Sequence, residues 1–371
     1  MNSRTYDTVV VGGGVVGMSL AYGLRLAGER VCVLDEGDDA LRASRGNFGL
    51  VWVQGKGLGC PAYTRWTMDA ARRWPAFAQD LMERTSVDVE LSQIGGLSIC
   101  LSDDELAGRA ATLETVRREV GGDYPFEVLG HNSLRELSPH IGPAVTGAVF
   151  CPLDGHVNPL RLLRSLVQGF EALGGKLLSS APVDRIEYRG GGFQVAAGGA
   201  VHATGKIVLA AGLGNLQLAP LVGLRAPVRP VRGQVLVSER VKPFLRHPAA
   251  RLRQTGEGSV QIGDSKEEVG LDDGTTLAQL ALMADRATRC FPLLEEVNIV
   301  RAWGSLRVMS PDGLPIYQAS KDFPGAFVVT CHSGITLAAQ HAGPLVDWIR
   351  GAAAPTDIAG FEAERFDVQT H

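Results

Sequence analysis

A glycine-rich turn near the start of the chain constrains its fold more than any other feature. An apolar run at residues 7–11 leads into Gly12, Gly14 and Gly17, which form the motif G-x-G-x-x-G. Apolar residues then recur at helical spacing over 16–28. Because glycine has no side chain, backbone N–H groups and the helix N-terminus can approach an anionic pyrophosphate. The turn therefore predicts a dinucleotide site.

An acidic pair completes this first unit. The second buried strand, 31–34, ends directly before Asp35 and Glu36. A carboxylate at that place can accept hydrogen bonds from both ribose hydroxyls and would repel a 2′-phosphate. Taken by themselves, the glycines could simply form a tight turn between a strand and a helix. The complete unit of two strands, the helix between them and the acidic residue after the second strand favours a bound dinucleotide.

Length and composition bound the remaining possibilities. A chain of 371 residues with 45% hydrophobic content predicts two domains. Its formal charge of -4 gives no basic excess for nucleic acid. No apolar run reaches the length of about 18 residues that crosses a bilayer, and we expect neither a transmembrane segment nor a signal peptide. The six cysteines show no CxxC motif and no spacing typical of a zinc site. We therefore expect buried thiols without a bound metal, as in a protein of the reducing cytoplasm.

The later chain alternates between parallel α/β and antiparallel patterns. In an NAD-type domain the buried strands usually follow one another closely along the chain. Here the next comparable buried strand after 31–34 comes only at 207–211. This long delay indicates a flavin rather than NAD. Helices are predicted at 61–84 with an interruption at Pro75, and at 160–173, 276–290 and 335–349. Strands are predicted at 96–101, 176–179, 235–237, 260–262 and 326–330, with a hairpin around 190–192.

Several segments together resemble the D-amino-acid-oxidase (DAO) family of FAD-dependent oxidoreductases over essentially the whole chain. They are VVVGGGVVGMSLAYGLRLAG, VCVLDEG, RASRGNFG, DGHVNP, VLAAGLGN, WGSLRVMSPDGLPI and CHSGIT. The resemblance implies an α/β FAD-binding Rossmann-like domain of the glutathione-reductase type, with an inserted α+β substrate domain built on an antiparallel sheet. The expected FAD-binding domain covers 1–75, 145–225 and 305–371, and the substrate domain covers 76–144 and 226–304.

The resemblance also implies a set of cofactor-binding positions. Near the pyrophosphate and ribose it implies Gly12, Gly14, Val15, Val16, Gly17, Asp35 and Glu36. The loop that passes the pyrophosphate and the flavin ring would contribute Arg42, Ala43, Ser44, Arg45, Asn47, Gly49 and Leu50. Guanidinium, hydroxyl and amide groups suit an anionic ligand, although a solvated surface loop explains the same residues.

Further positions come from later segments. Val183 would face the adenine, and Ala211, Gly212 and Gly214 would form a small-residue turn beneath the dinucleotide, where ordinary strand–helix packing is the other explanation. Gly334, Ile335 and Thr336 would begin the last helix, so that their N–H groups face the pyrimidine oxygen of the flavin. A plain helix cap also explains Gly334.

The resemblance places Arg307 on the substrate carboxylate, over the flavin face, and also counts it among the cofactor-binding positions. Its planar fork pairs with a carboxylate through two parallel hydrogen bonds, although position alone also fits a surface charge or an ion-pair partner. His332 and His156 could face the substrate, or could be ordinary core histidines. No catalytic base is assigned, because a well-oriented neutral amine can lose hydride directly.

The stretch RASRGNFGLVWVQGKGLG looks similar to the FAD-bearing β subunits of bacterial hetero-oligomeric amine dehydrogenases. These include D-hydroxyproline dehydrogenase, opine oxidase and hydrogen cyanide synthase. The similarity implies a second nucleotide-binding chain, a small iron–sulfur chain and an FMN at an interface, with membrane association through those partners.

The expected reaction is oxidation of a D-amino, imino or N-substituted amino acid by hydride transfer to FAD. D-Hydroxyproline is favoured, opines such as octopine and nopaline come next, and glycine or sarcosine follow. An FAD-holding scaffold subunit without turnover is a different class of answer, and an NAD-dependent dehydrogenase is another.

Overall fold

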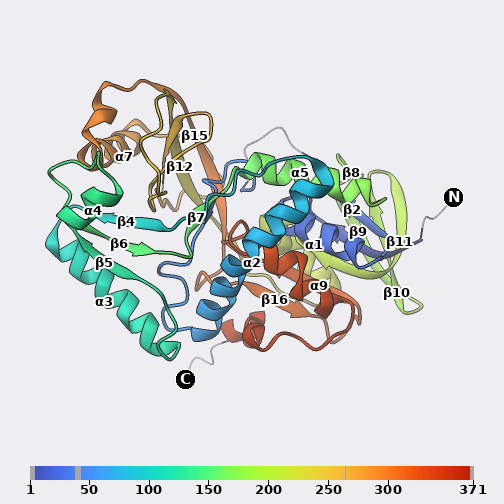
Figure 1. Cartoon of the computed structure of the whole chain (residues 1–371). Helices are drawn as coiled ribbons and strands as arrows, with labels where there is room; N and C mark the ends of the chain where they lie inside the picture. Colours follow the sequence, from blue (N-terminus) through green and yellow to red (C-terminus); the bar gives the residue numbers. More distant parts are fainter. Residues whose placement is uncertain (1–4, 38–42, 264, 368–371) are drawn as a thin grey trace.

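The computed structural model describes residues 5–37, 43–263 and 265–367. Figure 1 shows two bodies of chain on either side of the long helix α2 (Pro61–Thr85). One body is built on a largely parallel sheet and contains the N-terminal strand. The other is built on antiparallel sheets and carries α3 (Asp103–Glu119), α4 (His131–Leu137) and α7 (Leu277–Cys290).

The largely parallel sheet has eight strands within the described residues, and some of its outer strands pair antiparallel. Its centre is β1 (Thr5–Val11), which pairs in parallel with β2 (Val31–Leu34) and β11 (Ala200–Leu209). All four residues of β2 are buried, as expected for an apolar strand covered on both faces. The other strands are β8 (Lys176–Leu178), β9 (Val183–Arg189), β10 (Gly192–Ala197), β16 (Ile316–Ala319) and β17 (Ala326–Thr330).

Helices cover this sheet and complete its core. The glycine turn leads into α1 (Val15–Leu26), which packs against α5 (Pro159–Ala172). The side chain of Asn158 caps α5 by accepting from two backbone N–H groups of the first turn. The short helix α6 (Asn215–Leu218) follows the turn after β11. The βαβ unit that the sequence predicts is present as β1, α1 and β2, in which the two strands pair in parallel.

The antiparallel body contains two sheets and an apolar core of its own. The strand order is β13-β14-β12-β15 in the first sheet and β4-β6-β5 in the second. A separate two-stranded pair, β3 (Leu50–Val51) with β7 (Gly155–His156), lies between the bodies. The strands are β4 (Gly96–Cys100), β5 (Glu127–Gly130), β6 (Gly147–Cys151), β12 (Arg229–Arg240), β13 (Leu252–Gln254), β14 (Ser259–Ile262) and β15 (Ile299–Met309).

The predicted interruption of α2 at Pro75 is wrong, because the helix continues through that residue. Proline has no N–H for the carbonyl four residues earlier, which belongs to the buried Ala71. The side-chain amide of Gln93 supplies the missing donor, with its Nε2 at 2.9 Å from that carbonyl oxygen. A side chain from a distant segment thus keeps a proline inside a long helix.

The predicted last helix over 335–349 is also wrong in its extent. The structure has α8 (Ala338–Ala342) and α9 (Pro344–Ile349), which are separated at Gly343 because Pro344 has no N–H to continue the hydrogen bonding. Residues 334–337 form a turn before α8. Gly334, Ile335 and Thr336 therefore do not begin a helix.

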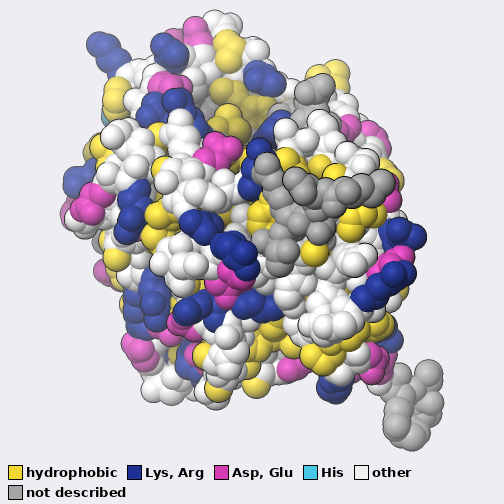
Figure 2. All heavy atoms as spheres, turned by 90° about the vertical axis from the view of Figure 1, so that its right-hand side faces the viewer, with side chains coloured by type: hydrophobic (Ala, Val, Ile, Leu, Met, Phe, Trp, Pro, Cys, Tyr) yellow, Lys and Arg dark blue, Asp and Glu magenta, His cyan; other side chains and the backbone are white. Residues whose placement is uncertain are grey.

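Other features of the described chain bear on the sequence predictions. None of the helices in the described ranges is both long and apolar enough to cross a membrane. No disulfide joins the six cysteines, and the part of the chain that the structure describes has no cluster of metal-ligating side chains. On the face in Figure 2, basic side chains lie beside acidic ones. The domain boundaries stay a prediction.

Candidate active site

The glycine turn is shaped by close backbone contacts. Gly12 has a φ of 110°, and a Cβ there would collide with the carbonyl oxygen of Ala210 at the end of β11. A Cβ on Gly17 would in turn collide with the carbonyl oxygen of Gly12. Only glycine fits both places, and the result is a turn between β1 and α1 whose backbone is partly accessible at Gly13 and Gly14.

The N-terminus of α1 can receive an anion. Gly14 caps the helix without a side-chain hydrogen bond among the described residues, and the first turn contains no acidic side chain. The Val15 N–H is 2.9 Å from the Ser44 hydroxyl, which brings the loop after β2 over this end of the helix. The N-terminus of α1, with its backbone N–H groups, and the Ser44 hydroxyl beside it would fit the pyrophosphate of FAD.

Asp35 lies beside the same turn. Its carboxylate accepts from the N–H of Gly13 at 2.6 Å and from the N–H of Gly37 at 2.9 Å. The side chain therefore stands at the end of β2, where a ribose would follow the pyrophosphate. Glu36 is exposed, so that the two members of the acidic pair have different environments.

The loop after β2 continues along the junction of the two bodies. Arg42 lies outside the described residues, Arg45 is exposed, and Ala43 packs against the apolar core beneath the parallel sheet. Asn47 accepts from the N–H of Gly49 at 2.7 Å, and Gly49 has a φ of 90°. Leu50 then enters β3.

The remaining predicted positions of the dinucleotide site lie next to the glycine turn or on a neighbouring hairpin. A Cβ on Gly12 would also touch Cα of Ala211, which precedes the 3-10 turn Gly212–Gly214. Val183 begins β9 and is half-buried against the core of the parallel sheet. The structure thus brings the 211–214 turn directly beneath the glycine motif.

The inner face of the four-stranded sheet covers the loop after β2. Trp303, Ser305 and Arg307 alternate along β15 and so point to the same side. The Trp303 indole donates to the carbonyl of Gly46 at 3.2 Å, and a Cβ on Gly46 would contact Ser305. The same face of β15 therefore presents Arg307 at the junction of the two bodies.

The guanidinium of Arg307 has a fixed position. It lies against Gly233, whose added Cβ would collide with it, and its Nη1 donates to the carbonyls of Arg232 at 3.1 Å and Ser265 at 2.7 Å. The side chain is half-buried. Such anchoring holds a planar fork in one orientation, as carboxylate recognition requires.

The segment 333–337, which contains the turn at 334–337, faces this region from the parallel-sheet body. The Lys56 ammonium donates to the Ser333 hydroxyl at 2.6 Å, and the Tyr63 hydroxyl donates to the same oxygen at 3.0 Å. The Trp74 indole donates to the Thr336 carbonyl at 3.0 Å. Side chains of α2 and of the 54–59 loop therefore position the turn that the sequence predicted as a helix start.

The turn also meets the glycine motif and β3. A Cβ on Gly334 would lie 3.1 Å from a methyl group of Val16, and Ile335 is buried in the adjoining core. The Thr336 hydroxyl accepts from the N–H of Trp52 at 3.1 Å. The 334–336 segment is thus in contact with both the start of α1 and the end of β3, although these are far apart in the sequence.

His332 precedes this turn and is half-buried. Burial lowers its pKa well below the usual range, and the positive charges of Lys56, Arg307 and Lys266 lower the pKa further. The imidazole is therefore neutral at physiological pH, and three cations act on it.

Sequence reasoning gave no role to Arg253, which is 2% exposed on β13. Its Nε donates to the carbonyl of Phe48, and its Nη1 lies 3.4 Å from His156 Nδ1. Burial lowers the pKa of Arg253 to about 10, so that it stays charged. Burial and Arg253 lower the pKa of His156 to about 4. His156 pairs with Leu50 of β3 and lies beside Arg253.

Asp154 was also missed, although it lies in the DGHVNP segment. It is fully buried and accepts from the Val53 N–H and, at 2.8 Å, from the Gln54 side chain. Burial raises its pKa to about 7. A fully buried acid cannot be recognised from a short motif, because the motif does not show what covers it.

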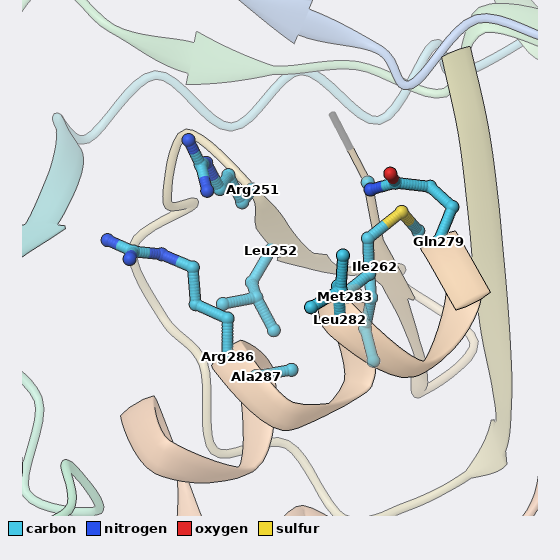
Figure 3. Close-up of a pocket in the computed structure, with 9 residues that line it drawn as sticks. Arg251, Leu252, Ile262, Gln279, Leu282, Met283, Arg286 and Ala287 are labelled. Atoms are coloured by element: carbon cyan, nitrogen blue, oxygen red, sulfur yellow. The ribbon is translucent and has the colours of Figure 1, made fainter. Parts of the chain in front are cut away.

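A separate pocket lies on the other side of the four-stranded sheet. Leu252, Ile262 and Met283 line it between β13, β14 and α7, and Arg251 and Arg286 lie at one side (Figure 3). Since Leu252 precedes Arg253 in the same strand, their side chains point to opposite faces. The pocket is thus on the face away from Arg307.

The parallel sheet, the glycine cradle and the antiparallel insertion define a dinucleotide-binding oxidoreductase. The family described as FAD dependent oxidoreductase (DAO) matches residues 7–348. An opine oxidase subunit of Agrobacterium tumefaciens is 42% identical over 98% of this chain and 98% of its own length. The hydrogen cyanide synthase subunit HcnC of Pseudomonas aeruginosa is 28% identical over 98% and 97%.

Among solved structures, glycine oxidase from Geobacillus kaustophilus has a TM-score of 0.88 at 24% identity and covers 97% of this chain and 98% of its own. That likeness concerns the fold. The chain belongs to the DAO family and is an FAD-dependent oxidoreductase. The predicted fold class, an FAD-binding domain with an inserted substrate domain, is confirmed.

Proposed function

We propose that this protein oxidises the CH–NH bond of an opine, a secondary amine that carries carboxylates on both of its carbon arms. The observation that carries the proposal is the position of Arg307, fixed on the inner sheet face at the junction with the cofactor loop. The 42% identity with an opine oxidase subunit supports an opine over D-hydroxyproline, which the sequence alone favoured.

Binding and orientation are the tasks of the protein in this proposal. Arg307 binds the carboxylate beside the reacting carbon, and the inner face with Trp303 excludes water from one side. Bound FAD supplies the two-electron acceptor for the hydride. The predicted cofactor positions, from Gly12 to Thr336, are proposed to hold it.

The proposal needs no dedicated base. Hydride leaves the carbon beside a neutral amine, whose lone pair assists the loss. Burial, together with the charges of Lys56, Arg307 and Lys266, lowers the pKa of His332 well below its usual range. The neutral imidazole therefore adds no positive charge of its own to the site.

The partner arrangement belongs to the proposal as well. Relatives named as subunits support association with further chains. A second nucleotide-binding chain and a small iron–sulfur chain would carry electrons onward, with an FMN at an interface. A cytoplasmic location, with membrane association only through these chains, fits this arrangement.

The test is reduction of the flavin in the co-expressed complex under anaerobic conditions, with opines, D-hydroxyproline and glycine as donors. We expect opines to bleach the flavin fastest and Arg307→Ala to lower kcat/KM by about a hundredfold or more while flavin remains bound. Arg229→Ala is the matched control, since Arg229 is an exposed arginine of the same sheet.

Two results would contradict the proposal. Unchanged turnover in Arg307→Ala, with normal folding by circular dichroism, would reject the assigned role. A complex that binds FAD but reduces it with none of the donors would favour a scaffold subunit.

A further inference from the structure

A buried arginine lies against the part of the loop after β2 that leads into β3. Arg253 is 2% exposed, and its Nε donates to the carbonyl of Phe48. Its guanidinium carbon lies 3.3 Å from the place that a Cβ on Gly49 would occupy. The carbonyl of Gly49 accepts from the Val157 N–H at 2.8 Å. Arg253 thus contacts the two residues directly before Leu50, whose backbone is fixed from the other body.

The four-stranded sheet holds both the backbone and the ring of Phe48. Arg253 on β13 binds the carbonyl, and its guanidinium carbon lies 5.9 Å from the centroid of the ring. Gly263 follows β14, and a Cβ there would lie 2.9 Å from a carbon of the same ring. The sheet that carries Arg307 therefore also sets the course of the chain at Gly49 and Leu50, two of the proposed cofactor positions.

The charge of Arg253 is held beside neutral groups. Its Nη1 lies 3.4 Å from Nδ1 of His156, and burial together with Arg253 lowers the pKa of that imidazole to about 4. Burial lowers the pKa of Arg253 itself to about 10, whereas the charge of Glu90 acts in the opposite direction. Glu90 has a cation of its own, Arg161, at 3.2 Å. Among the described residues, Glu90 therefore offsets the buried charge only in part.

Taking a guanidinium out of water costs free energy, and an anion that forms nearby offsets this cost. FAD accepts two electrons from the substrate, and its reduced ring can carry a negative charge. We propose that Arg253 is a positioning residue for the flavin, which fixes Phe48 and Gly49 and whose buried charge favours the reduced, anionic form of the ring. This inference rests on the proposed placement of FAD along the loop after β2 and names a residue that sets its reduction potential.

The test compares Arg253→Gln with Arg253→Lys, because both side chains can donate to the Phe48 carbonyl and only the lysine is charged. The reduction potential of the flavin is measured on the full chain loaded with FAD, by chemical reduction in the presence of a reference dye. In Arg253→Gln the equilibrium constant for flavin reduction falls about tenfold, which is about 30 mV for a two-electron couple. Arg253→Lys retains most of the potential.

The matched control is Arg251→Gln, which removes an exposed charge two residues away in the chain. Arg251 lies at the pocket between β13, β14 and α7, on the side shown in Figure 3. Water and salt screen an exposed charge, so this variant keeps the potential of the unmodified protein. A fall in Arg251→Gln as large as that in Arg253→Gln would show a general effect of net charge and would overturn the role of Arg253.

The potential separates this inference from a purely structural role and from the proposed function. If Arg253 only supports the loop, both of its variants weaken FAD binding and the bound flavin has the same potential in both, which would refute the inference. If no opine reduces the unmodified complex, the proposed function fails, and the dye titration, which needs no substrate, still tests Arg253. If opines reduce it and the two variants have equal potentials, the inference is wrong and the proposed function stands.

The unmodified protein provides a second measurement in case a variant does not retain FAD. The chemically reduced flavin should have the absorption spectrum of the reduced anion at pH 6, because a buried cation lowers the pKa of a neighbouring acid. The spectrum of neutral reduced flavin at that pH would contradict the inference.

Discussion

The continuity of α2 through Pro75 leads to a quantitative prediction about Gln93. The Gln93 amide donates to the carbonyl of Ala71 at 2.9 Å and to the carbonyl of Leu153 at 2.8 Å. Gln93→Leu leaves both carbonyls without this donor, and each lost hydrogen bond costs about 1–1.5 kcal/mol. The Oε1 atom of Gln93 has no partner among the described residues, and its removal offsets part of this cost. We expect a loss of about 2 kcal/mol in the free energy of unfolding.

Pro75 provides the internal check. In Pro75→Ala the new N–H bonds the Ala71 carbonyl, so that Gln93→Leu leaves only the Leu153 carbonyl without a donor. The cost of Gln93→Leu should then fall by about 1 kcal/mol, which is a coupling energy that a double-mutant cycle measures. Urea unfolding of the FAD-loaded protein, followed by circular dichroism, is the assay.

The control is Gln79→Leu, at an exposed glutamine of the same helix, for which we expect a change within about 0.5 kcal/mol. An equal cost of Gln93→Leu with and without the Pro75→Ala substitution would refute the account of how the helix passes the proline. The site should respond too, because Trp74, next to Pro75, holds the Thr336 carbonyl. A lower affinity for FAD in Gln93→Leu is therefore expected.

Three further predictions concern the cradle and its support. Gly12→Ala should abolish FAD binding in a fluorescence titration, and the collision of its Cβ with the backbone should lower the free energy of unfolding by about 1–3 kcal/mol. The control is Gly28→Ala, which should keep FAD bound, because Gly28 also has a positive φ, of 86°, but open space around it. Asp35→Ala should weaken FAD binding about tenfold or more, and an unchanged dissociation constant would speak against its placement at the ribose. Asp154 has a folded-state pKa raised to about 7 from 3.8, so its stabilising contribution is complete below about pH 4 and is lost as pH rises through 7. The unfolding free energy of the unmodified protein should fall by about 2–3 kcal/mol more between pH 5 and 8 than that of Asp154→Asn, and parallel pH profiles would contradict the raised pKa.

The sequence predicted the elements that depend on neighbours in the chain. The βαβ unit, α5, α7 and the hairpin of β9 and β10 form close to the predicted ranges, because apolar periodicity, glycine turns and an Asn cap act over a few residues. The two helix errors have the opposite cause. At Pro75 a distant amide overrides the local rule. At 334–337 the chain forms a turn where the pattern resembles a helix, and the side chains of Lys56, Tyr63 and Trp74 hold that segment through Ser333 and Thr336.

The sequence by itself determined that a dinucleotide cradle starts this chain, since the steric demand for Gly12 and Gly17 and the acid after the second strand are written within about one βαβ unit. Only the tertiary structure decided which side chains meet. Arg307 reaches the carbonyl of Ser265 across the antiparallel body, and the ammonium of Lys56 reaches the Ser333 hydroxyl from a distant loop. Electrostatic action depends on distance in space, and separation along the chain does not encode that distance.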